Sequence, residues 1–210
     1  MNDPTTTRWW WVRHAVVPNP GQLVYGALDF DCDTSDTVSF EGLARNLPEN
    51  AVWVVSGLKR AHQTAEAISR AGLKRPEFVV EPAFNEQSFG DWQKRSWEEI
   101  RREEGPRYSQ IWQRPADFRP PNGESFVDQM GRVTPAIERL TREYAGRDII
   151  AVTHGGTIRV AITHALDLKP QRAMSIFIEN LSMTGLYWVA DSEGRGSWRV
   201  EAINRLPVLR

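Results

Sequence analysis

Residues able to bind and transfer a phosphoryl group recur in this chain directly behind short apolar runs. Four of them stand out: Arg13 and His14 behind residues 9–12, Arg60 behind residues 51–55, and His154 behind residues 148–152. The planar guanidinium of arginine matches phosphoryl oxygens bidentately, and a neutral imidazole can attack phosphorus as a nucleophile. Taken alone, Arg13 and His14 would be interpreted as the start of a solvated loop, but the repetition favours shared chemistry.

Each of the three apolar runs is typical of a buried strand, because no polar residue alternates with the apolar ones. Strands and helices alternate along most of the chain, which predicts an α/β fold. We expect a three-layer α/β/α sandwich around a mostly parallel sheet, with a C-terminal hairpin adding an antiparallel edge. The carboxyl ends of parallel strands meet at one edge of such a sheet, where ligands bind. The four residues are therefore expected to converge there.

The remaining elements follow from periodicity and from cap and turn residues. Strands are predicted at residues 77–81, 175–179, 185–190 and 198–203, and helices at residues 39–47, 58–72, 96–104, 124–144 and 157–166. Ser96 and Glu99 have the spacing of a capping box, and Pro135 is expected to kink or divide the long helix. Residues 1–7 are expected to be frayed and residues 16–36 to form a loop, as are residues 105–123 apart from one helical turn. We expect a single domain, residues 1–210, with a lid at about residues 86–121.

Composition restricts the partners and the compartment. The formal net charge of −1 over 210 residues gives no bulk attraction to nucleic acid or to anionic membranes. Arginine outnumbers lysine, which suits local recognition of oxyanions. The single cysteine, Cys32, excludes an intrachain disulfide and a cysteine-cluster metal site, which favours a reducing compartment. Because the chain has neither a signal-peptide pattern nor an apolar run of the ~20 residues that a membrane helix needs, we expect a cytoplasmic protein.

Five segments of the chain match the motifs of one protein family. They are VRHA at residues 12–15, SGLKRAHQTA at 56–65, NEQSFGDW at 85–92, NGES at 122–125 and VTHGG at 152–156. Each motif is weak alone, but all five occur in the family's order and span nearly the whole chain. The chain therefore resembles the histidine phosphatase superfamily, also called phosphoglycerate mutase-like. The resemblance implies a phosphoglycerate mutase-like fold and hydrolysis of phosphomonoesters without a metal or another cofactor.

The resemblance also implies a role for each matching residue. His14 would attack phosphorus and carry a phosphohistidine, and Arg13 and Arg60 would bind the phosphoryl oxygens. His154, assisted by the backbone of Gly155, would stabilise the transition state. Glu86 stands at the family's acid/base position, so it would protonate the leaving oxygen and then deprotonate water. We expect a small phosphorylated metabolite as the substrate, and a monomer or homodimer as the assembly.

The loop behind His14 departs from the family pattern. Ala15 stands where the family usually has Gly, and Pro20 stands at the position of the family's loop Asn. Asn19, one residue earlier, is expected to substitute for it in substrate binding, and Tyr25 is expected to touch the leaving group. The segment GQLVYGALD, residues 21–29, resembles a loop of α-ribazole phosphatases, which makes α-ribazole phosphate one possible substrate.

Two alternatives to a hydrolase stay open at this point. The altered loop is compatible with a catalytically weak relative that binds a phospho-ligand or phosphoprotein for regulation, whereas a pure binder has no need of Glu86. A phosphoglycerate mutase is the second alternative, and against it the chain lacks the arginine-rich region with which mutases hold a phosphoglycerate carboxylate. Among the other histidines, His62 is expected to face solvent and His164 to be structural.

Overall fold

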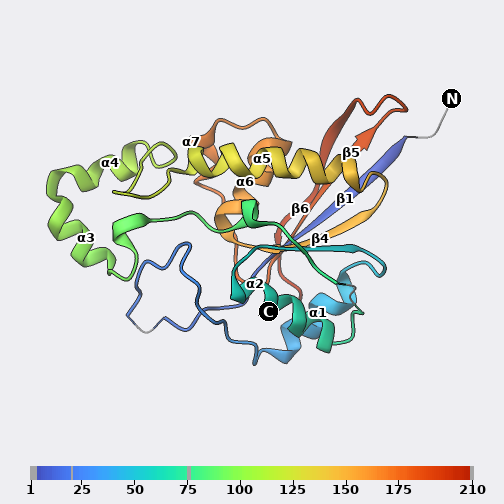
Figure 1. Cartoon of the computed structure of the whole chain (residues 1–210), viewed down its shortest axis with the longest axis horizontal. Coiled ribbons are helices and arrows are strands. Elements are labelled where there is room, and N and C mark those ends of the chain that lie inside the picture. The colour runs from blue at the N-terminus through green and yellow to red at the C-terminus, as the bar shows by residue number, and fades with distance from the viewer. Residues whose placement is uncertain (1–3, 20, 75–76, 209–210) are drawn as a thin grey trace.

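A mixed six-stranded sheet forms the centre of the protein in the computed structural model, which describes residues 4–19, 21–74 and 77–208. The strand order is β3-β2-β4-β1-β5-β6 (Figure 1). The strands are β1 (Thr5–Arg13), β2 (Val52–Val55), β3 (Val79–Val80), β4 (Asp148–Thr153), β5 (Met183–Ala190) and β6 (Gly196–Arg205). Strands β3, β2, β4 and β1 are parallel, and β5 and β6 are antiparallel to their neighbours. This confirms the predicted mostly parallel sheet with an antiparallel edge.

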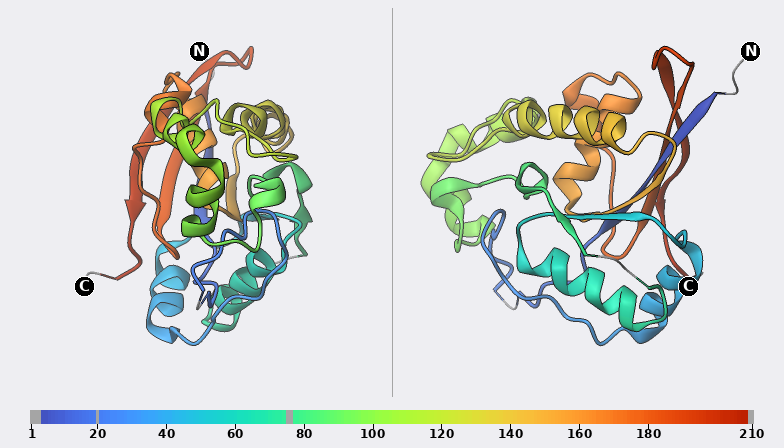
Figure 2. Two further views of the ribbon diagram at one scale, coloured as in Figure 1. Left: turned by 90° about the vertical axis from the view of Figure 1, so that its left-hand side faces the viewer. Right: turned by 45° about the vertical axis from the view of Figure 1, so that its right-hand side comes forward.

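Helices cover both faces of this sheet (Figure 2). Helices α1 (Thr37–Asn46) and α2 (Lys59–Arg70) pack on one face, and helices α5 (Phe126–Glu143) and α6 (Gly155–Ala165) pack on the other. Separate clusters of buried apolar side chains fill the two interfaces. The protein is therefore the expected three-layer α/β/α sandwich.

Strand β1 is central because its side chains enter both layers. Successive side chains of a strand point to opposite faces, so Trp9 and Trp11 enter the α5–α6 layer and Val12 enters the α1–α2 layer. The rings of Trp9 and Trp11 stack with their centroids 4.7 Å apart, and the indole N–H of Trp9 donates to Thr141 Oγ1 on α5 at 3.0 Å. Such large buried rings hold the end of β1, and with it His14, in one position.

Two predictions for the strands were wrong. Of residues 1–7, which were expected to be frayed, residues 1–3 lie outside the described residues, and residues 5–7 begin β1 because β5 offers them a pairing partner, with Thr5 opposite Ala190. Residues 175–179 form no strand. Two arginine side chains bind carbonyl groups of this segment instead, from Arg159 Nε to Ile176 O at 2.7 Å and from an Arg13 guanidinium nitrogen to Ile178 O at 2.6 Å. Ile178 of that segment is nevertheless buried in the same apolar cluster as Trp9 and Trp11.

The long helix α5 also differs from its prediction, since it continues through Pro135 without division. Its amphipathic face is buried on both sides of the proline, by Val133 before it and by Ile137 and Leu140 after it. Tertiary packing of such a face supplies most of a helix's stability, so one missing backbone hydrogen bond does not divide it. The short helix α7 (Pro170–Ala173) was not predicted.

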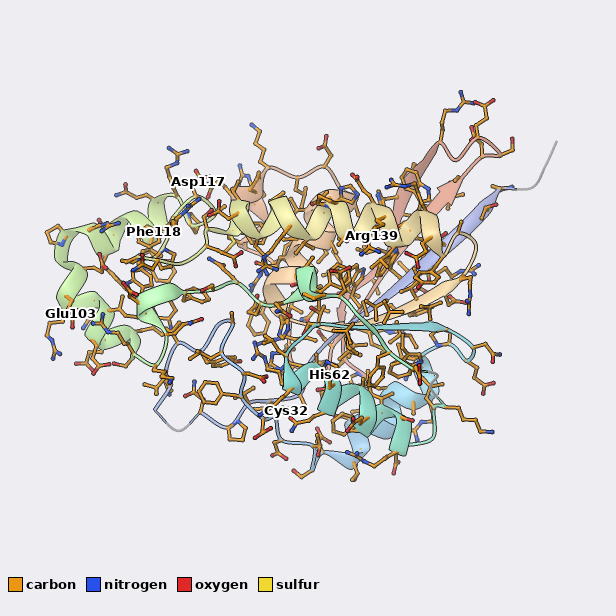
Figure 3. The ribbon with its side chains drawn as sticks, in the orientation of Figure 1. Cys32, His62, Glu103, Asp117, Phe118 and Arg139 are labelled. Atoms are coloured by element: carbon orange, nitrogen blue, oxygen red, sulfur yellow. The ribbon has the colours of Figure 1, made fainter. Side chains whose placement is uncertain are left out.

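Residues 86–121 form an arm that extends from the sandwich on the left of Figure 1. The arm contains 3₁₀ turns at Gly90–Trp92 and Gly105–Arg107 and the helices α3 (Trp97–Glu104) and α4 (Tyr108–Gln113), so residues 105–123 are more helical than expected. Helix α3 begins at the predicted capping box of Ser96 and Glu99. The arm has its own apolar cluster, which includes Trp92, Ile100 and the Phe118 ring that is labelled in Figure 3.

The loop of residues 16–36 is joined to this arm. Backbone hydrogen bonds of 2.8 Å run from Val24 N to Arg95 O and from Lys94 N to Val24 O, and the Val24 side chain is buried in the arm's apolar cluster. The loop and the arm therefore meet next to the carboxyl ends of the strands, while a lid function of the arm stays a prediction. Across the described ranges, no helix is long and apolar enough to cross a membrane.

Candidate active site

Strand register brings His14 and His154 together. Arg13, the last residue of β1, lies opposite Thr153, the last residue of β4, in adjacent parallel strands. The residues that follow are therefore neighbours, and the ring centroids of His14 and His154 are 5.1 Å apart. Strand β2 ends on the other side of β4, where Ser56 Oγ lies 2.7 Å from His154 Nε2. The structure thus brings together the groups that three separate apolar runs were expected to deliver.

The hydrogen bonds of His14 indicate which ring nitrogen has the lone pair. Its Nδ1 lies 2.6 Å from Ala15 O, and because a carbonyl only accepts, Nδ1 carries the proton. Nε2 therefore has the lone pair, and it accepts from Arg60 Nε at 3.3 Å. Burial, together with the positive charges of Arg60 and Arg13, holds the pKa of His14 well below its usual value of 6.5. The imidazole is therefore neutral at pH 7, as a nucleophile requires.

Arg60 is fully buried beneath the loop of residues 16–36. Besides the bond to His14, its two terminal nitrogens donate to Leu28 O and Gly26 O, each at 2.6 Å. The Tyr25 ring lies against the same guanidinium, 5.2 Å from its central carbon. Arg60 thus ties the loop to the nucleophile, and its further N–H donors are the ones available for a phosphoryl oxygen.

Arg13 and the start of α6 supply more N–H groups. The Nε of Arg13 is buried and has no hydrogen-bond partner within the part of the chain that the structure describes. It lies near Gly155, since a Cβ added to that glycine would be 3.6 Å from it. Gly155 is the first residue of α6, where backbone N–H groups and the helix dipole favour an anion. These donors suit the oxygens of a phosphoryl group.

The carboxylate of Glu86 lies at the start of α6. Its Oε2 accepts from Gly156 N at 3.3 Å, and its Oε1 accepts from Gln87 N at 3.0 Å and from Gln129 Nε2 at 3.2 Å. The structure therefore brings the carboxylate to the N-terminus of α6, next to His154. Of the ranges described, no group of three or more His, Cys, Asp and Glu side chains could hold a metal ion.

A sequence model of the histidine phosphatase superfamily (branch 1) matches residues 9–205, which is nearly the whole chain. The chain belongs to this superfamily. Among curated relatives, a 2,3-bisphosphoglycerate-dependent phosphoglycerate mutase of Bartonella henselae is 31% identical over 57% of this chain, and the match spans only 60% of that mutase. A metal-independent phosphoserine phosphatase of Arabidopsis thaliana is 28% identical over 86% of this chain and 78% of its own length.

Solved structures of the superfamily share the fold. A mycobacterial glucosyl-3-phosphoglycerate phosphatase is 26% identical, with a TM-score of 0.80 over 95% of this chain and 99% of its own. A protein from Escherichia coli, described as a putative α-ribazole-5′-phosphate phosphatase, superposes with a TM-score of 0.79 over 99% of this chain and 100% of its own. Its identity of 21% carries no more than the fold.

Tyr25 and Asn19 were both expected to contact the substrate. The structure places Tyr25 beside the site and Asn19 within its own loop. Tyr25 lies over Arg60, as described above, and so borders the site. Asn19 instead binds its own loop, because its amide donates to Leu23 O at 2.7 Å and accepts from Leu23 N at 3.0 Å. The structure does not bring the Asn19 amide to His14 or Arg60, so its role in substrate binding stays a prediction.

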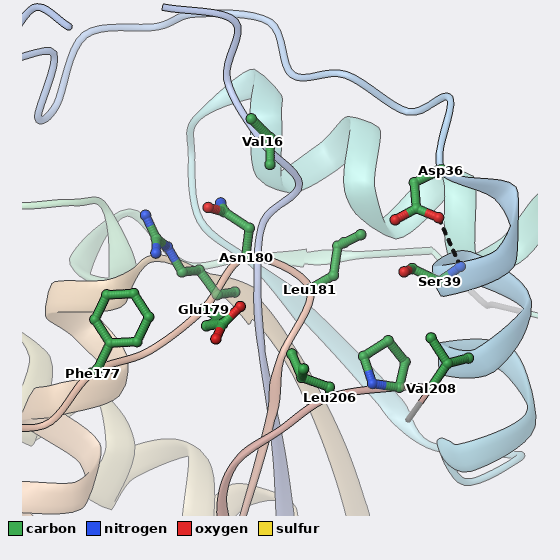
Figure 4. A pocket seen from close by; sticks show the side chains of 11 residues that line it. Val16, Asp36, Ser39, Phe177, Glu179, Asn180, Leu181, Leu206 and Val208 are labelled. Atoms are coloured by element: carbon green, nitrogen blue, oxygen red, sulfur yellow. Dashed lines mark hydrogen bonds between the residues drawn. The ribbon is translucent and has the colours of Figure 1, made fainter. Parts of the chain in front are cut away.

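Sequence reasoning missed Asn180, which binds the backbone of the nucleophile His14. Its Nδ2 donates to the backbone carbonyl of His14 at 2.8 Å. Asn180 also lines a cavity of about 280 Å³ beside Arg13 (Figure 4), with the exposed Val16 and Phe177 and the carboxylate of Glu179 on its wall. Phe177, Glu179 and Asn180 are more than 160 positions from His14 in the sequence. Only the tertiary structure therefore shows that they lie near it.

Two further histidines and Ser125 have other contacts. His62 is half-buried against Phe78 rather than solvent-facing (Figure 3). His164 is half-buried against Trp198, and burial lowers its pKa. Ser125 caps α5 in a reciprocal capping box with Asp128.

The two buried histidines predict a pH-dependent stability. Burial, more than any other cause, lowers the pKa of His14 and His154 well below 6.5. The unfolded chain binds these protons near pH 6.5, whereas the folded chain binds them only at a lower pH. The free energy of unfolding is therefore not reduced by these histidines above about pH 6.5. It falls with decreasing pH, by up to about 1.4 kcal/mol per pH unit for each histidine. Urea unfolding at pH 7.5, 6.5 and 5.5 measures this. His14→Asn should show a smaller loss of stability than wild type, and an unchanged loss would contradict the burial argument.

Proposed function

We propose that this chain is a metal-independent phosphomonoester hydrolase that acts through a phosphohistidine on a small phosphorylated metabolite. The observation that carries the proposal is the neutral, fully buried His14, whose lone-pair nitrogen Nε2 faces the Arg60 guanidinium. A group that only binds phosphate would gain from being positively charged, whereas a nucleophile must be neutral. The phosphatases among the superfamily relatives support the same proposal.

In the first step, the His14 Nε2 lone pair forms an N–P bond and the P–O bond to the leaving group breaks. The leaving oxygen takes a proton from Glu86, and Arg13, Arg60 and the α6 N-terminus stabilise the charge on the phosphoryl oxygens. In the second step, water gives a proton to the Glu86 carboxylate and attacks phosphorus. The N–P bond then breaks, its electron pair returns to Nε2, and inorganic phosphate leaves with the enzyme restored.

The non-phosphoryl part of the substrate has two places to lie. One is the mixed apolar and polar cavity beside Arg13, where Phe177 is 66% exposed. The other is the loop that carries Tyr25 and Phe30, whose rings contact each other edge to face. Because the loop also carries the α-ribazole phosphatase-like segment, α-ribazole phosphate belongs in any substrate panel. The proposal places the reaction in the cytoplasm.

Glu86→Gln tests the acid role through its dependence on the leaving group. A p-nitrophenolate departs without help, whereas an alkoxide requires a proton in the transition state. We expect kcat/KM, which reports the first transfer, to fall by about a hundredfold or more for an alkyl phosphate and by no more than about tenfold for p-nitrophenyl phosphate. All assays contain EDTA.

Wild-type protein is the reference for both substrates. Equal losses on the two substrates would remove Glu86 as the acid, and dependence of wild type on added metal would contradict the mechanism. Wild-type protein as inactive as His14→Ala on a broad panel of phosphomonoesters would favour the binding alternative.

A further inference from the structure

Gln129 is a buried amide next to Glu86 that neither the motif set nor the proposed mechanism uses. It lies on α5, its side chain is 0% exposed, and its Nε2 has three oxygen neighbours. These are Glu86 Oε1 at 3.2 Å, Thr157 Oγ1 at 3.3 Å and Asn85 O at 3.4 Å. The Thr157 hydroxyl donates its own proton to Phe84 O at 3.0 Å, so it accepts from the amide. Three acceptors identify this end of the side chain as the NH₂ group.

The other end of the amide has no partner. Gln129 Oε1 is a buried acceptor without a hydrogen bond among the described residues. A Cβ added to Gly156 would lie 2.6 Å from this oxygen and 2.3 Å from Glu86 Oε1. The amide oxygen and the carboxyl group therefore both border Gly156, and only a glycine leaves room for them. A buried acceptor without a donor lowers the stability of the folded protein. Its presence here is explained if a donor proton is present in one state of the reaction and absent in another.

Resting on the proposed function, we propose that Gln129 is a positioning residue that holds Glu86 in both of its protonation states. When Glu86 is a carboxylate, the NH₂ group donates to it, as the structure shows. When Glu86 is protonated, its O–H donates to Gln129 Oε1, which then has its missing partner, until the O–H turns to the leaving oxygen and gives up the proton. The acid thus keeps one orientation while it loses its proton to the leaving oxygen and regains one from water.

The test replaces the amide side chain of Gln129 by methionine and compares the result with the same substitution at Gln171, outside the site. Gln129→Met keeps the length of the side chain and removes both hydrogen-bonding atoms. We expect kcat/KM to fall by about ten- to thirtyfold for an alkyl phosphate and by less than about threefold for p-nitrophenyl phosphate. Gln171→Met is the matched control, since Gln171 also uses both ends of its amide, with Ala116 N at 3.1 Å and Asp117 Oδ2 at 3.0 Å, outside the site. It should change neither value.

Gln129→Asn provides a second variant that keeps a polar group at the buried position but withdraws it from Glu86, and it should show the same difference between substrates. Equal losses on both substrates would assign Gln129 a purely structural role and overturn the inference, and so would no loss at all. Glu86→Gln separates the two proposals. If it shows the difference between substrates and the Gln129 variants do not, only the role of Gln129 fails. If Glu86→Gln shows no difference either, the acid role of Glu86 fails together with that of Gln129, and if wild type is inactive, the proposed function fails as well.

Discussion

Replacing His14 by alanine is expected to lower kcat by at least about 10⁴-fold, because it removes the atom that forms the bond to phosphorus. The other imidazole of the site belongs to His154, whose Nε2 lies 2.7 Å from Ser56 Oγ, and we expect it not to replace His14 as the nucleophile. The measurement is hydrolysis of p-nitrophenyl phosphate in the presence of EDTA. The fold should be kept, because Trp9, Trp11 and Val12 anchor β1 on both sides of the sheet.

The covalent intermediate gives a second measurement of the same role. With Glu86→Gln, attack of water loses its base, so a phosphorylated chain should accumulate when p-nitrophenyl phosphate is added. Mass spectrometry after an alkaline quench should find one phosphoryl group on His14 of this variant and none on a Glu86→Gln, His14→Ala double variant. His62→Ala, outside the site, is the control and should retain full activity. If His14→Ala kept more than about one hundredth of the wild-type rate, the nucleophile would have to lie elsewhere.

Arg60→Met is expected to have the second largest effect, because it acts on chemistry and on folding together. Removing its N–H donors and charge should lower kcat/KM by about 10³- to 10⁴-fold. It also leaves the carbonyls of the buried Gly26 and the half-buried Leu28 without their donor, which should reduce the free energy of unfolding by roughly 2–4 kcal/mol. Kinetics with p-nitrophenyl phosphate and urea unfolding measure the two effects.

The pH dependence of kcat/KM in Arg60→Met is expected to shift in a definite direction. The positive charge of Arg60 is one cause of the low pKa of His14, so its removal should raise that pKa and move the acidic limb of kcat/KM toward neutral pH. Arg60→Lys is the comparison, because it keeps the charge but not the fork that reaches both carbonyls. It should keep the wild-type acidic limb and still lose most of the rate. An unmoved limb in Arg60→Met would contradict the electrostatic role.

Much of the fold could be predicted because its signals are local. The uninterrupted apolar run that contains Val54 marks β2, and the alternation of strands with amphipathic helices marks the layered class. The failures occur where a partner decides the outcome. Residues 5–7 become a strand only because β5 lies beside them, and residues 175–179 remain irregular because Arg13 and Arg159 bind their carbonyls.

For the site, the amino-acid sequence by itself determined which residue types stand at the strand ends, and hence Arg13, His14, Arg60 and His154 as one group. Only the tertiary structure decided which atoms meet. Four features depend on strand register and side-chain packing: the bond from Arg60 to His14, the bonds from Arg60 to the loop, the bond from Asn180 to His14, and the place of Gln129 beside Glu86. The hydrogen bonds of Arg60, Asn180 and Gln129 named here join positions 32 to 166 residues apart. Periodicity describes only neighbours along the chain, which is why it indicates the elements and their ends but not these hydrogen bonds.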